Sequence, residues 1–393
     1  MRVVIVVSHP IQHFCPQYRS ISQREDVELI VVFDSMKGVE EYHDKDFGRT
    51  VQWGSQLVTG FEWIDLDSSE LSLSETLNQC APDWLIIYGY SSSISRRAWR
   101  WATSHVVRLA YISDSELRHR HSRLKFALKR VALKTLFRRV DLFLSVGDAN
   151  TEYYRNMGAR DATITRMHFP IDTHEFDSAR VDPKVSTGLR SDLNISASAV
   201  VITMVGKFIE RKRQQDLIDA CRRFTGDQAH LLLIGSGPDQ DKLRESARSA
   251  GNVTVVGFVP PSNLSAYYDL TDIYAHVSSY DPHPLAVSEA LASGCSLIVS
   301  SSTGSWGPND DVREFRNGLV VETENPKLLH DALAILIHNP AMREDFSLAS
   351  REMSEEHQSL AHGGFIDAMI KLTPETQSPA PLARLLRRQP NDS

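Results

Sequence analysis

Short apolar runs recur along the chain, and longer stretches with apolar residues at helical spacing separate them. The runs are rich in Val, Ile and Leu and do not alternate with polar residues, which is typical of strands buried on both faces of a parallel sheet. The first half contains runs at 3–7, 27–33, 84–88, 107–112 and 142–146. The second half contains runs at 200–205, 230–234, 253–256, 273–277, 296–300 and 318–321. The pattern predicts an α/β fold with two doubly wound parallel sheets.

The two series of strands predict two domains, and a chain of 393 residues is longer than one ordinary domain. The interdomain linker is placed where a polar stretch carries Pro183 and Gly188. Prolines and small polar residues with little periodicity close the chain, which predicts a mobile tail. The predicted parts are an N-terminal domain, a linker, a C-terminal domain and a tail, over 1–170, 171–195, 196–372 and 373–393.

Composition and charge narrow the class of protein. Lys and Arg number 43 against 50 Asp and Glu, and this mildly acidic balance argues against bulk affinity for nucleic acid while leaving local patches open. The 4 cysteines lie far apart with no Cys-x-x-Cys pair, so neither a zinc cluster nor a disulfide framework is predicted. No apolar run approaches the roughly 20 residues of a membrane-spanning helix. We expect a cytoplasmic protein without a structural metal.

The loop after the run at 200–205 carries the first candidate site. In open parallel sheets, ligands bind beyond the carboxyl ends of the strands. Gly206 permits a close backbone approach, and Lys207 and Lys212 stand where two cations could clamp a diphosphate near a helix start. A solvated basic turn explains the same spacing equally well.

Two further strand ends could contribute to a nucleotide site. Gly235 follows a strand but belongs only to a fragment of a dinucleotide-binding pattern. Phe258 and Val259 follow the next strand, where an apolar backbone segment could form a slot for a planar base. A plain turn is the alternative at both places.

The segment 278–294 forms the strongest constellation. Pro284 suits the first turn of a helix, so Leu285 and Ala286 would present unpaired backbone N–H groups to phosphate oxygens at the positive helix end. Glu289, one turn deeper, could accept hydrogen bonds from two ribose hydroxyls, and Asp281 could reach a sugar hydroxyl. The alternative is a capped helix of the core, with Asp281 at the surface and with the hydrogen bonds of Glu289 made within the protein.

These residues resemble the C-terminal domain of retaining GT-B glycosyltransferases of family four. That family has two acids separated by seven residues, and Asp281 and Glu289 keep the spacing with a shorter first acid. Lys207 and Lys212 match its diphosphate clamp. The family usually has Gly-Phe-Gly after the first acid, whereas this chain has Pro-His-Pro with His283 at the centre, so a backbone donor at 284 is lost.

The first half resembles bacterial polysaccharide glycosyltransferases of the same group more loosely. The segments 8–13, 46–48 with Trp53, and 113–116 carry that likeness. The resemblance implies that His9, in the loop after the first strand, lies near the acceptor and the diphosphate. It also implies that Asp114 faces the same cleft close to the reacting sugar, although Asp114 equally suits a helix N-cap.

The resemblance implies two Rossmann-like domains facing across a cleft and a nucleoside-diphosphate-sugar donor. It further implies retention of anomeric configuration without a side-chain nucleophile, an obligatory metal or a cofactor. The catalytic set is then Lys207, Lys212, Asp281, Asp114 and His9. The donor set is Gly206, Gly235, Phe258, Val259, His283, Leu285, Ala286 and Glu289.

A basic segment over 118–140 bears on the acceptor. It carries nine Lys and Arg, no acid and interleaved apolar residues, which predicts a basic amphipathic helix. Such a helix could lie on an anionic membrane surface, face an anionic acceptor or simply be solvated. We expect a lipid-linked or saccharide acceptor at the inner membrane surface. The alternatives are a transferase acting on modified DNA bases, a nucleotide-sugar epimerase and a non-catalytic binding module.

Overall fold

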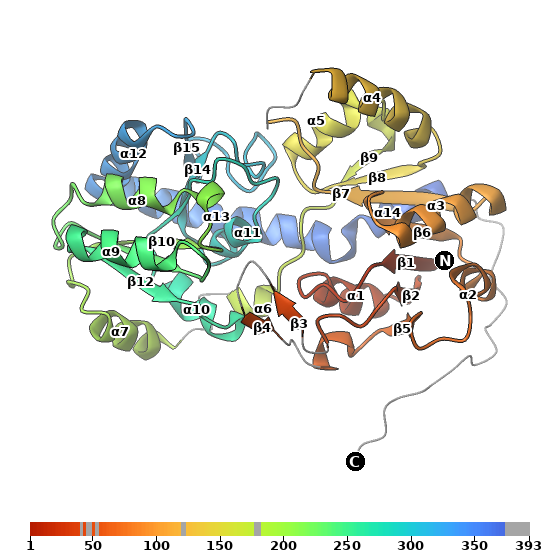
Figure 1. Ribbon diagram of the computed structural model, residues 1–393, viewed down its shortest axis with the longest axis horizontal. Coiled ribbons are helices and arrows are strands. Elements are labelled where there is room, and N and C mark those ends of the chain that lie inside the picture. Colours follow the sequence, from red (N-terminus) through yellow and green to blue (C-terminus); the bar gives the residue numbers. More distant parts are fainter. Residues whose placement is uncertain (40–41, 45–48, 52–54, 119–122, 177–181, 374–393) are drawn as a thin grey trace, which may run out of the picture.

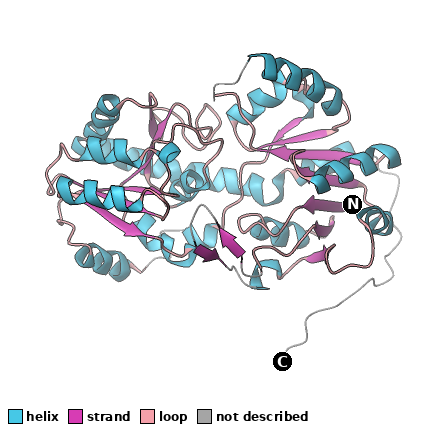
Figure 2. Cartoon of the chain, in the orientation of Figure 1, coloured by secondary structure: helices cyan, strands magenta, loops and turns pink. Residues whose placement is uncertain are grey.

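The computed structural model describes residues 1–39, 42–44, 49–51, 55–118, 123–176 and 182–373. Two lobes lie side by side, and each contains a parallel sheet with helices on both faces (Figures 1 and 2). The α/β prediction with two doubly wound sheets is confirmed. The predicted tail falls outside the described residues from 374 onward.

The N-terminal sheet has seven parallel strands in the order β5-β2-β1-β6-β7-β8-β9. The strands are β1 (Arg2–Val7), β2 (Glu28–Phe33), β5 (Glu62–Asp65), β6 (Trp84–Tyr88), β7 (Arg108–Ser113), β8 (Leu142–Ser145) and β9 (Ile164–Arg166). The helices of this lobe are α1 (Cys15–Ser22), α2 (Leu73–Cys80), α3 (Ser93–His105), α4 (Arg123–Phe137) and α5 (Asp148–Asn156). The strands β3 (Tyr42–Asp44) and β4 (Arg49–Val51) pair antiparallel in a separate two-stranded sheet.

The C-terminal sheet has six parallel strands in the order β12-β11-β10-β13-β14-β15. The strands are β10 (Val200–Val205), β11 (Ala229–Ile234), β12 (Val253–Gly257), β13 (Ile273–His276), β14 (Ser296–Ser300) and β15 (Gly318–Val321). The helices are α6 (Thr173–Phe176), α7 (Pro183–Asp192), α8 (Gln214–Cys221), α9 (Gln240–Ala250), α10 (Pro261–Asp269), α11 (Leu285–Ala292), α12 (Pro326–His338) and α13 (Pro340–Ser359). The last helix, α14 (Ile366–Leu372), packs on the first lobe.

Burial on both faces explains why the strand runs are continuously apolar. In β1, Ile5 packs into one core cluster and its neighbours Val4 and Val6 pack into the cluster on the opposite face of the sheet. All six residues of this strand are buried. Side chains alternate across a strand, so a strand covered by helices on both sides needs apolar residues at every position.

The domain boundaries differ from the predicted ones at two places. Ile171 and Phe176, in the predicted linker, are buried in a core cluster of the C-terminal domain. Phe365, Ile366 and Met369, assigned to the C-terminal domain from the sequence, are buried in a core cluster of the N-terminal domain. The reason is that the chain crosses back: in Figure 1 the blue C-terminal helices run from one lobe to the other.

The returning segment is fastened to the first lobe by polar contacts. Helix α13 ends at Ser359, and a kinked turn with Gly363 at φ 130° leads into α14. Gln17 donates its side-chain amide to the carbonyl of Ala361 at 2.6 Å, and Ser20 donates to the carbonyl of His362 at 2.7 Å. The chain therefore passes between the domains twice.

Each sheet has one point at which the strand order reverses, and ligand crevices lie there in doubly wound folds. The reversal falls between β1 and β6 in the first sheet and between β10 and β13 in the second. His9 follows β1, whereas Gly206 follows β10 and Asp281 follows β13. Among the described residues, no helix is long and apolar enough to cross a membrane.

Candidate active site

Two glycine turns meet at the carboxyl edge of the second sheet. The N–H of Phe208 donates to the carbonyl of Ser236 at 2.9 Å. A Cβ added at Gly235 would lie 1.9 Å from the carbonyl oxygen of Gly206, so no side chain fits there. Gly206 and Gly235 also have φ values of 156° and 148°, which glycine adopts readily. Packing therefore requires glycine at position 235, and the backbone conformation favours it at position 206. The predicted contact of both glycines with a donor stays a prediction.

Lys212 and Asp281 form a buried ion pair between the turn after β10 and the loop after β13. The Nζ of Lys212 donates to Oδ2 of Asp281, and each side chain is only 10% exposed. Backbone contacts fix the two segments, because Ser279 N–H donates to the carbonyl of Arg211 at 2.8 Å. The fold thus brings together a predicted clamp lysine and the first predicted acid.

His276, at the end of β13, completes this pair and was not predicted from the sequence. Its Nε2 lies 2.9 Å from Oδ2 of Asp281, and its Nδ1 lies 3.2 Å from the hydroxyl of Tyr274. Burial raises the pKa of Asp281, but the hydrogen bond from His276 and the charge of Lys212 lower it by more than burial raises it. The net shift of the pKa is downward. Burial lowers the pKa of Lys212 against the pull of Asp281.

Lys207 occupies the same turn, half-buried. Its carbonyl accepts a hydrogen bond from the side-chain amide of Gln214 at 2.9 Å, which ties the turn to the start of α8. Its charge contributes to lowering the pKa of Lys212, so the two ammonium groups lie within electrostatic reach. The arrangement places two cations at one strand end.

Helix α11 begins at Leu285, directly after the loop that holds Asp281. Its N-cap residue is Pro284, which makes no side-chain cap hydrogen bond. The backbone N–H groups of Leu285 and Ala286 belong to the first turn, where a helix lacks internal acceptors. The predicted anion-binding helix start is therefore formed, while its binding of phosphate stays a prediction.

Glu289 lies on α11 and is partly buried. Its Oε2 accepts a hydrogen bond from the hydroxyl of Tyr268 at 2.7 Å. Burial raises the pKa of Glu289 to about 7, with a further upward contribution from the charge of Glu175, while the Tyr268 hydrogen bond opposes the shift. Glu289 therefore changes its charge close to neutral pH, which the sequence did not predict.

Phe258 and Val259 follow β12 and are half-buried, and Val259 packs against the core cluster that contains Val287 of α11. They lie at the same sheet edge as the other predicted donor residues. Their contact with a planar base stays a prediction.

His283 is buried between the two domains rather than exposed in the donor loop. Its Nε2 lies 3.3 Å from Oδ1 of Asp310 and 3.9 Å from Oδ2 of Asp311. Burial lowers the pKa of His283, but these two carboxylates raise it by more than burial lowers it. The net shift of the pKa is upward. The adjacent pair of acids was not singled out in the sequence, although two consecutive aspartates after a glycine-rich loop were a visible signal.

Of the two N-terminal candidates, Asp114 faces the C-terminal site. Burial and the charge of Asp281 raise its pKa, whereas the charge of His283 lowers it. Asp114 therefore lies within electrostatic reach of Asp281 and His283 in the other domain. His9 contacts its neighbour instead: its Nδ1 lies 2.9 Å from the hydroxyl of Ser8, and burial and the charge of Lys37 lower its pKa.

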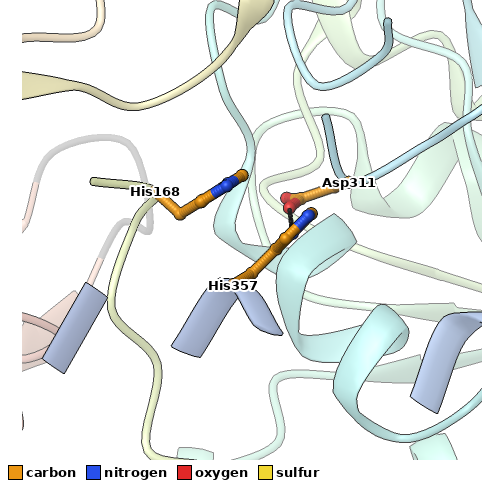
Figure 3. A group of neighbouring side chains, drawn as sticks. All are labelled: His168, Asp311 and His357. Carbon is orange, nitrogen blue, oxygen red and sulfur yellow. Dashed lines mark hydrogen bonds and ion pairs between the residues drawn. The ribbon is translucent and has the colours of Figure 1, made fainter. Parts of the chain in front are cut away.

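A second group of histidines and an acid lies near the crossover (Figure 3). His168, Asp311 and His357 are buried, and Nδ1 of His357 lies 3.0 Å from Oδ1 of Asp311. The rings of His168 and His357 stack at a centroid distance of 3.7 Å and an interplanar angle of 13°. Their in-plane lone pairs run nearly parallel instead of converging, so this arrangement suits ring packing better than shared ligation of an ion.

The basic segment divides into two parts. Arg118 is not on the predicted helix: its guanidinium donates to the carbonyls of Thr303 and Trp306 in the C-terminal domain and lies 4.0 Å from the centroid of the Trp306 ring. Residues 119–122 lie outside the described residues. The helix α4 starts at Arg123 and buries Leu133 and Phe137 in the core of the first domain.

The opposite face of α4 combines apolar and basic side chains. Leu128 and Val131 are 65% and 70% exposed. Lys134 on the helix is exposed as well, and so are Arg138 and Arg139 in the turn that follows it. We refer to these five residues together with Arg130 as the α4 surface.

The solved structures identify the fold class. The chain matches the Anabaena protein Alr3699/HepE, solved in complex with UDP, with a TM-score of 0.69 and 15% sequence identity, covering 95% of this chain and 100% of that one. Two parallel-sheet domains with this topology define the GT-B fold of glycosyltransferases, so the predicted fold is confirmed.

The family model is more specific. Residues 187–353 match the model described as Glycosyl transferases group 1. The resemblance found in the sequence motifs is thereby confirmed over residues 187–353.

The curated relatives are bacterial glycosyltransferases. The chain is 32% identical over 129 residues to an uncharacterized glycosyltransferase of Haemophilus influenzae, covering 33% of this chain and 36% of the relative. It is 28% identical over 174 residues to the lipopolysaccharide core biosynthesis glycosyltransferase LpsE of Rhizobium meliloti, covering 44% and 47%. The chain thus spans less than half the length of these two relatives.

A longer and weaker match covers both domains. Over 352 residues the chain is 22% identical to a GDP-mannose-dependent monoacylated alpha-(1-6)-phosphatidylinositol monomannoside mannosyltransferase of Corynebacterium glutamicum, covering 87% of this chain and 89% of the relative.

Proposed function

We propose that the protein is a retaining glycosyltransferase that moves a sugar from a nucleoside-diphosphate-sugar donor to a lipid-linked or saccharide acceptor. The observation that carries the proposal is the juxtaposition of Lys212, Asp281 and the open start of α11 at the strand-order reversal of the second sheet. Fixed positive charge and unpaired N–H groups at one sheet edge are suited to a departing diphosphate.

Each group has a role in that reaction. Lys207 and Lys212 neutralise charge that develops on the leaving diphosphate, together with the N–H groups of α11. Asp281 holds Lys212 in place before the donor arrives, because their ion pair is buried and already formed. Glu289 accepts hydrogen bonds from the ribose hydroxyls. The ammonium groups and the helix start supply the charge stabilisation, so the reaction runs without an obligatory metal or cofactor.

Retention follows a front-face path in this proposal. The leaving diphosphate accepts the acceptor's proton, so no side chain acts as a nucleophile. Asp114 and His9 belong to the acceptor side, and the electrostatic coupling of Asp114 to Asp281 and His283 supports its placement near the reacting sugar. The acceptor class is supported by the relatives, which include proteins named for lipopolysaccharide core and phosphatidylinositol mannoside synthesis.

The test combines binding and product analysis. Thermal unfolding is measured with a panel of nucleoside diphosphates and their sugars, because a ligand that binds only the folded state raises apparent stability with its concentration. The donor that binds is then incubated with and without saccharide acceptors, and the anomeric configuration of the product is read by NMR. Inversion of configuration would overturn the retaining mechanism. Absence of binding by every nucleotide would overturn the proposed function.

We also propose that the protein works at an anionic membrane surface through the α4 surface. The two exposed apolar side chains stand among cations, and surface cations attract anionic lipid at about 1 kcal/mol each near the membrane. Neutralising Arg130, Lys134, Arg138 and Arg139 together should release the protein from anionic vesicles and leave donor hydrolysis unchanged. A DNA acceptor predicts instead a salt-sensitive duplex affinity that this variant loses and no vesicle binding by the parent.

A further inference from the structure

The loop between β14 and β15 reaches from the C-terminal domain to the first helix turn of α5 in the N-terminal domain. Asp310 of this loop is fully buried. Its Oδ2 accepts a hydrogen bond from the backbone N–H of Asp148 at 2.6 Å, and its Oδ1 lies 3.3 Å from Nε2 of His283. One carboxylate therefore touches the start of a helix in one domain and a donor-loop histidine in the other.

Gly147 shows how closely the two domains approach at this point. A Cβ at Gly147 would lie 2.6 Å from Oδ2 of Asp310 and 3.0 Å from Cδ2 of His283. The backbone of Gly147 is extended, with φ −166°, which any residue adopts. Glycine is needed here for space and not for its conformation.

Two neighbouring contacts close the same seam. Oδ2 of Asp148 accepts a hydrogen bond from the N–H of Asn309 at 2.8 Å. Arg118 donates to two carbonyls of the same loop, as described above. We call the contacts of Arg118, Gly147 and Asp148 with residues 303–310 the interdomain seam.

His283 has one ring nitrogen engaged and one available. Nε2 faces Asp310, whereas Nδ1 is buried and has no hydrogen-bond partner among the described residues. A buried polar atom without a partner is costly, so such an atom points to a ligand. His283 stands two residues after Asp281 and directly before Pro284, the N-cap of α11, which places it beside the candidate donor site.

We propose that Asp310 is a positioning residue that couples the interdomain seam to His283, and that His283 uses Nδ1 to contact an oxygen of the donor's transferred sugar. The inference rests on the proposed function, because it names a residue that reads the sugar of that donor. When the seam is closed, the Asp148 N–H and His283 fix both carboxylate oxygens of Asp310. When the seam opens, Asp310 loses the N–H of Asp148 and keeps only partners of its own domain, His283 and the backbone N–H of Asp311, so His283 is held less firmly.

The experiment uses two variants of the full chain that disturb the seam from opposite domains. Asp310→Asn replaces one of the two carboxylate oxygens with an amide nitrogen, and Gly147→Ala inserts a methyl group between the domains without changing any charge. The matched controls are Asp227→Asn and Gly226→Ala, which lie at an exposed turn, and a Cβ at Gly226 meets no atom within 4 Å.

Three readouts are compared with the parent. Small-angle scattering without nucleotide should show a larger radius of gyration in both seam variants and no change in the controls. Affinity for the free nucleoside diphosphate should stay within twofold of the parent, while affinity for the complete donor and the turnover number each fall by about tenfold, as expected for a lost hydrogen bond to a charged group. His283→Ala should produce the same loss of donor affinity, and its combination with Gly147→Ala should add nothing further.

Unchanged radius of gyration in both seam variants would overturn the coupling, whatever the protein binds. Equal loss of affinity for the diphosphate and the complete donor would overturn the contact with the sugar. If the parent protein binds no nucleotide, the proposed function and the sugar contact are both wrong. The scattering result would still decide whether Asp310 and Gly147 hold the domains together.

Discussion

The donor edge of the C-terminal domain and the α4 surface of the N-terminal domain use charge in opposite ways. Lys212, Asp281 and His276 are buried, paired and fixed by hydrogen bonds. The cations of the α4 surface are exposed to solvent, on α4 and in the turn after it, while the other face of this helix lies in the core. In the first region the charges are set in place before a ligand arrives. In the second they lie at the solvent-exposed surface, where Arg130 donates to the carbonyl of Asn156 at 2.9 Å.

The difference has physical consequences for specificity. Charges held in a low-dielectric site act strongly and demand a ligand of matching geometry. Exposed charges are screened by salt and tolerate partners of varied shape, because each contributes little and can move. We infer that the buried charges select the donor by its geometry, whereas the exposed charges recognise the acceptor side only by its overall charge. Substitutions should therefore have large effects on activity in the first region and small effects on binding in the second.

The largest effect is expected for Lys212→Ala. Turnover should fall by roughly 100- to 1000-fold, as when one charge-stabilising group is removed from an active site. The free energy of unfolding should also fall, by about 3 kcal/mol, because the buried carboxylate of Asp281 loses its cation and keeps only the hydrogen bond with His276. Turnover is measured by donor hydrolysis and stability by urea unfolding. Lys242→Ala, an exposed lysine on α9, is the control, and near-normal turnover of the Lys212 variant would exclude the clamp.

Asp281→Asn should lower turnover by roughly 10- to 100-fold, because Lys212 loses its charged partner and its fixed position. Affinity for free nucleoside diphosphate should change little, since the added freedom of Lys212 affects the transition state more than the ground state. Kinetics and calorimetry on the same preparation separate the two. If this variant and Glu289→Gln lose equal affinity for the diphosphate, the proposed division of roles between the two acids is wrong.

Glu289 should make nucleotide affinity depend on pH. Burial raises its pKa to about 7, so the carboxyl is neutral below this pH and charged above it. A charged carboxylate accepts stronger hydrogen bonds from hydroxyls, so affinity for the nucleoside diphosphate should rise as pH increases from 6 to 8. Glu289→Gln should lower affinity by about tenfold at pH 8 and flatten the profile. A profile that stays steep in the variant would assign the titration to another group.

The smallest effect is expected on the α4 surface. Replacing Leu128 and Val131 with Ala should weaken binding to anionic vesicles by about fivefold, because side chains that enter only the headgroup region bury part of their apolar area. Sedimentation with vesicles measures the change. Leu348→Ala, which truncates an exposed leucine on α13, is the matched control. A loss as large as that from neutralising the cations would show that insertion, and not charge, dominates.

The sequence predicted the sheets well because buried parallel strands leave a continuous apolar signal. The bounds of β6, β10, β14 and β15 coincide with the predicted runs. The strand β9 was missed: it lies at a sheet edge, is short and is only partly buried, so no apolar run marks it. The return of α14 to the first lobe was also missed, because an amphipathic helix does not reveal which sheet it covers.

The candidate site was predictable where its parts lie close to a strand end. Lys212 and Asp281 were found by their positions after β10 and β13, and the fold pairs them. Asp310 could not be found in this way, since its partners are Asp148 and His283, at sequence separations of 162 and 27 residues. Contacts between domains depend on how the two folded domains pack against each other, and local sequence patterns carry no information about that packing.

The crossing of the chain back to the first lobe also bears on how the protein is made. Phe365, Ile366 and Met369 belong to the same core cluster as Val3 and Ile5. The first lobe therefore cannot complete its interior when its own strands have been synthesised. About 200 more residues must follow, which takes on the order of 10 to 40 s at typical elongation rates. During this interval an apolar groove remains open on the nascent lobe, and the ribosome must finish the second lobe before the first can close.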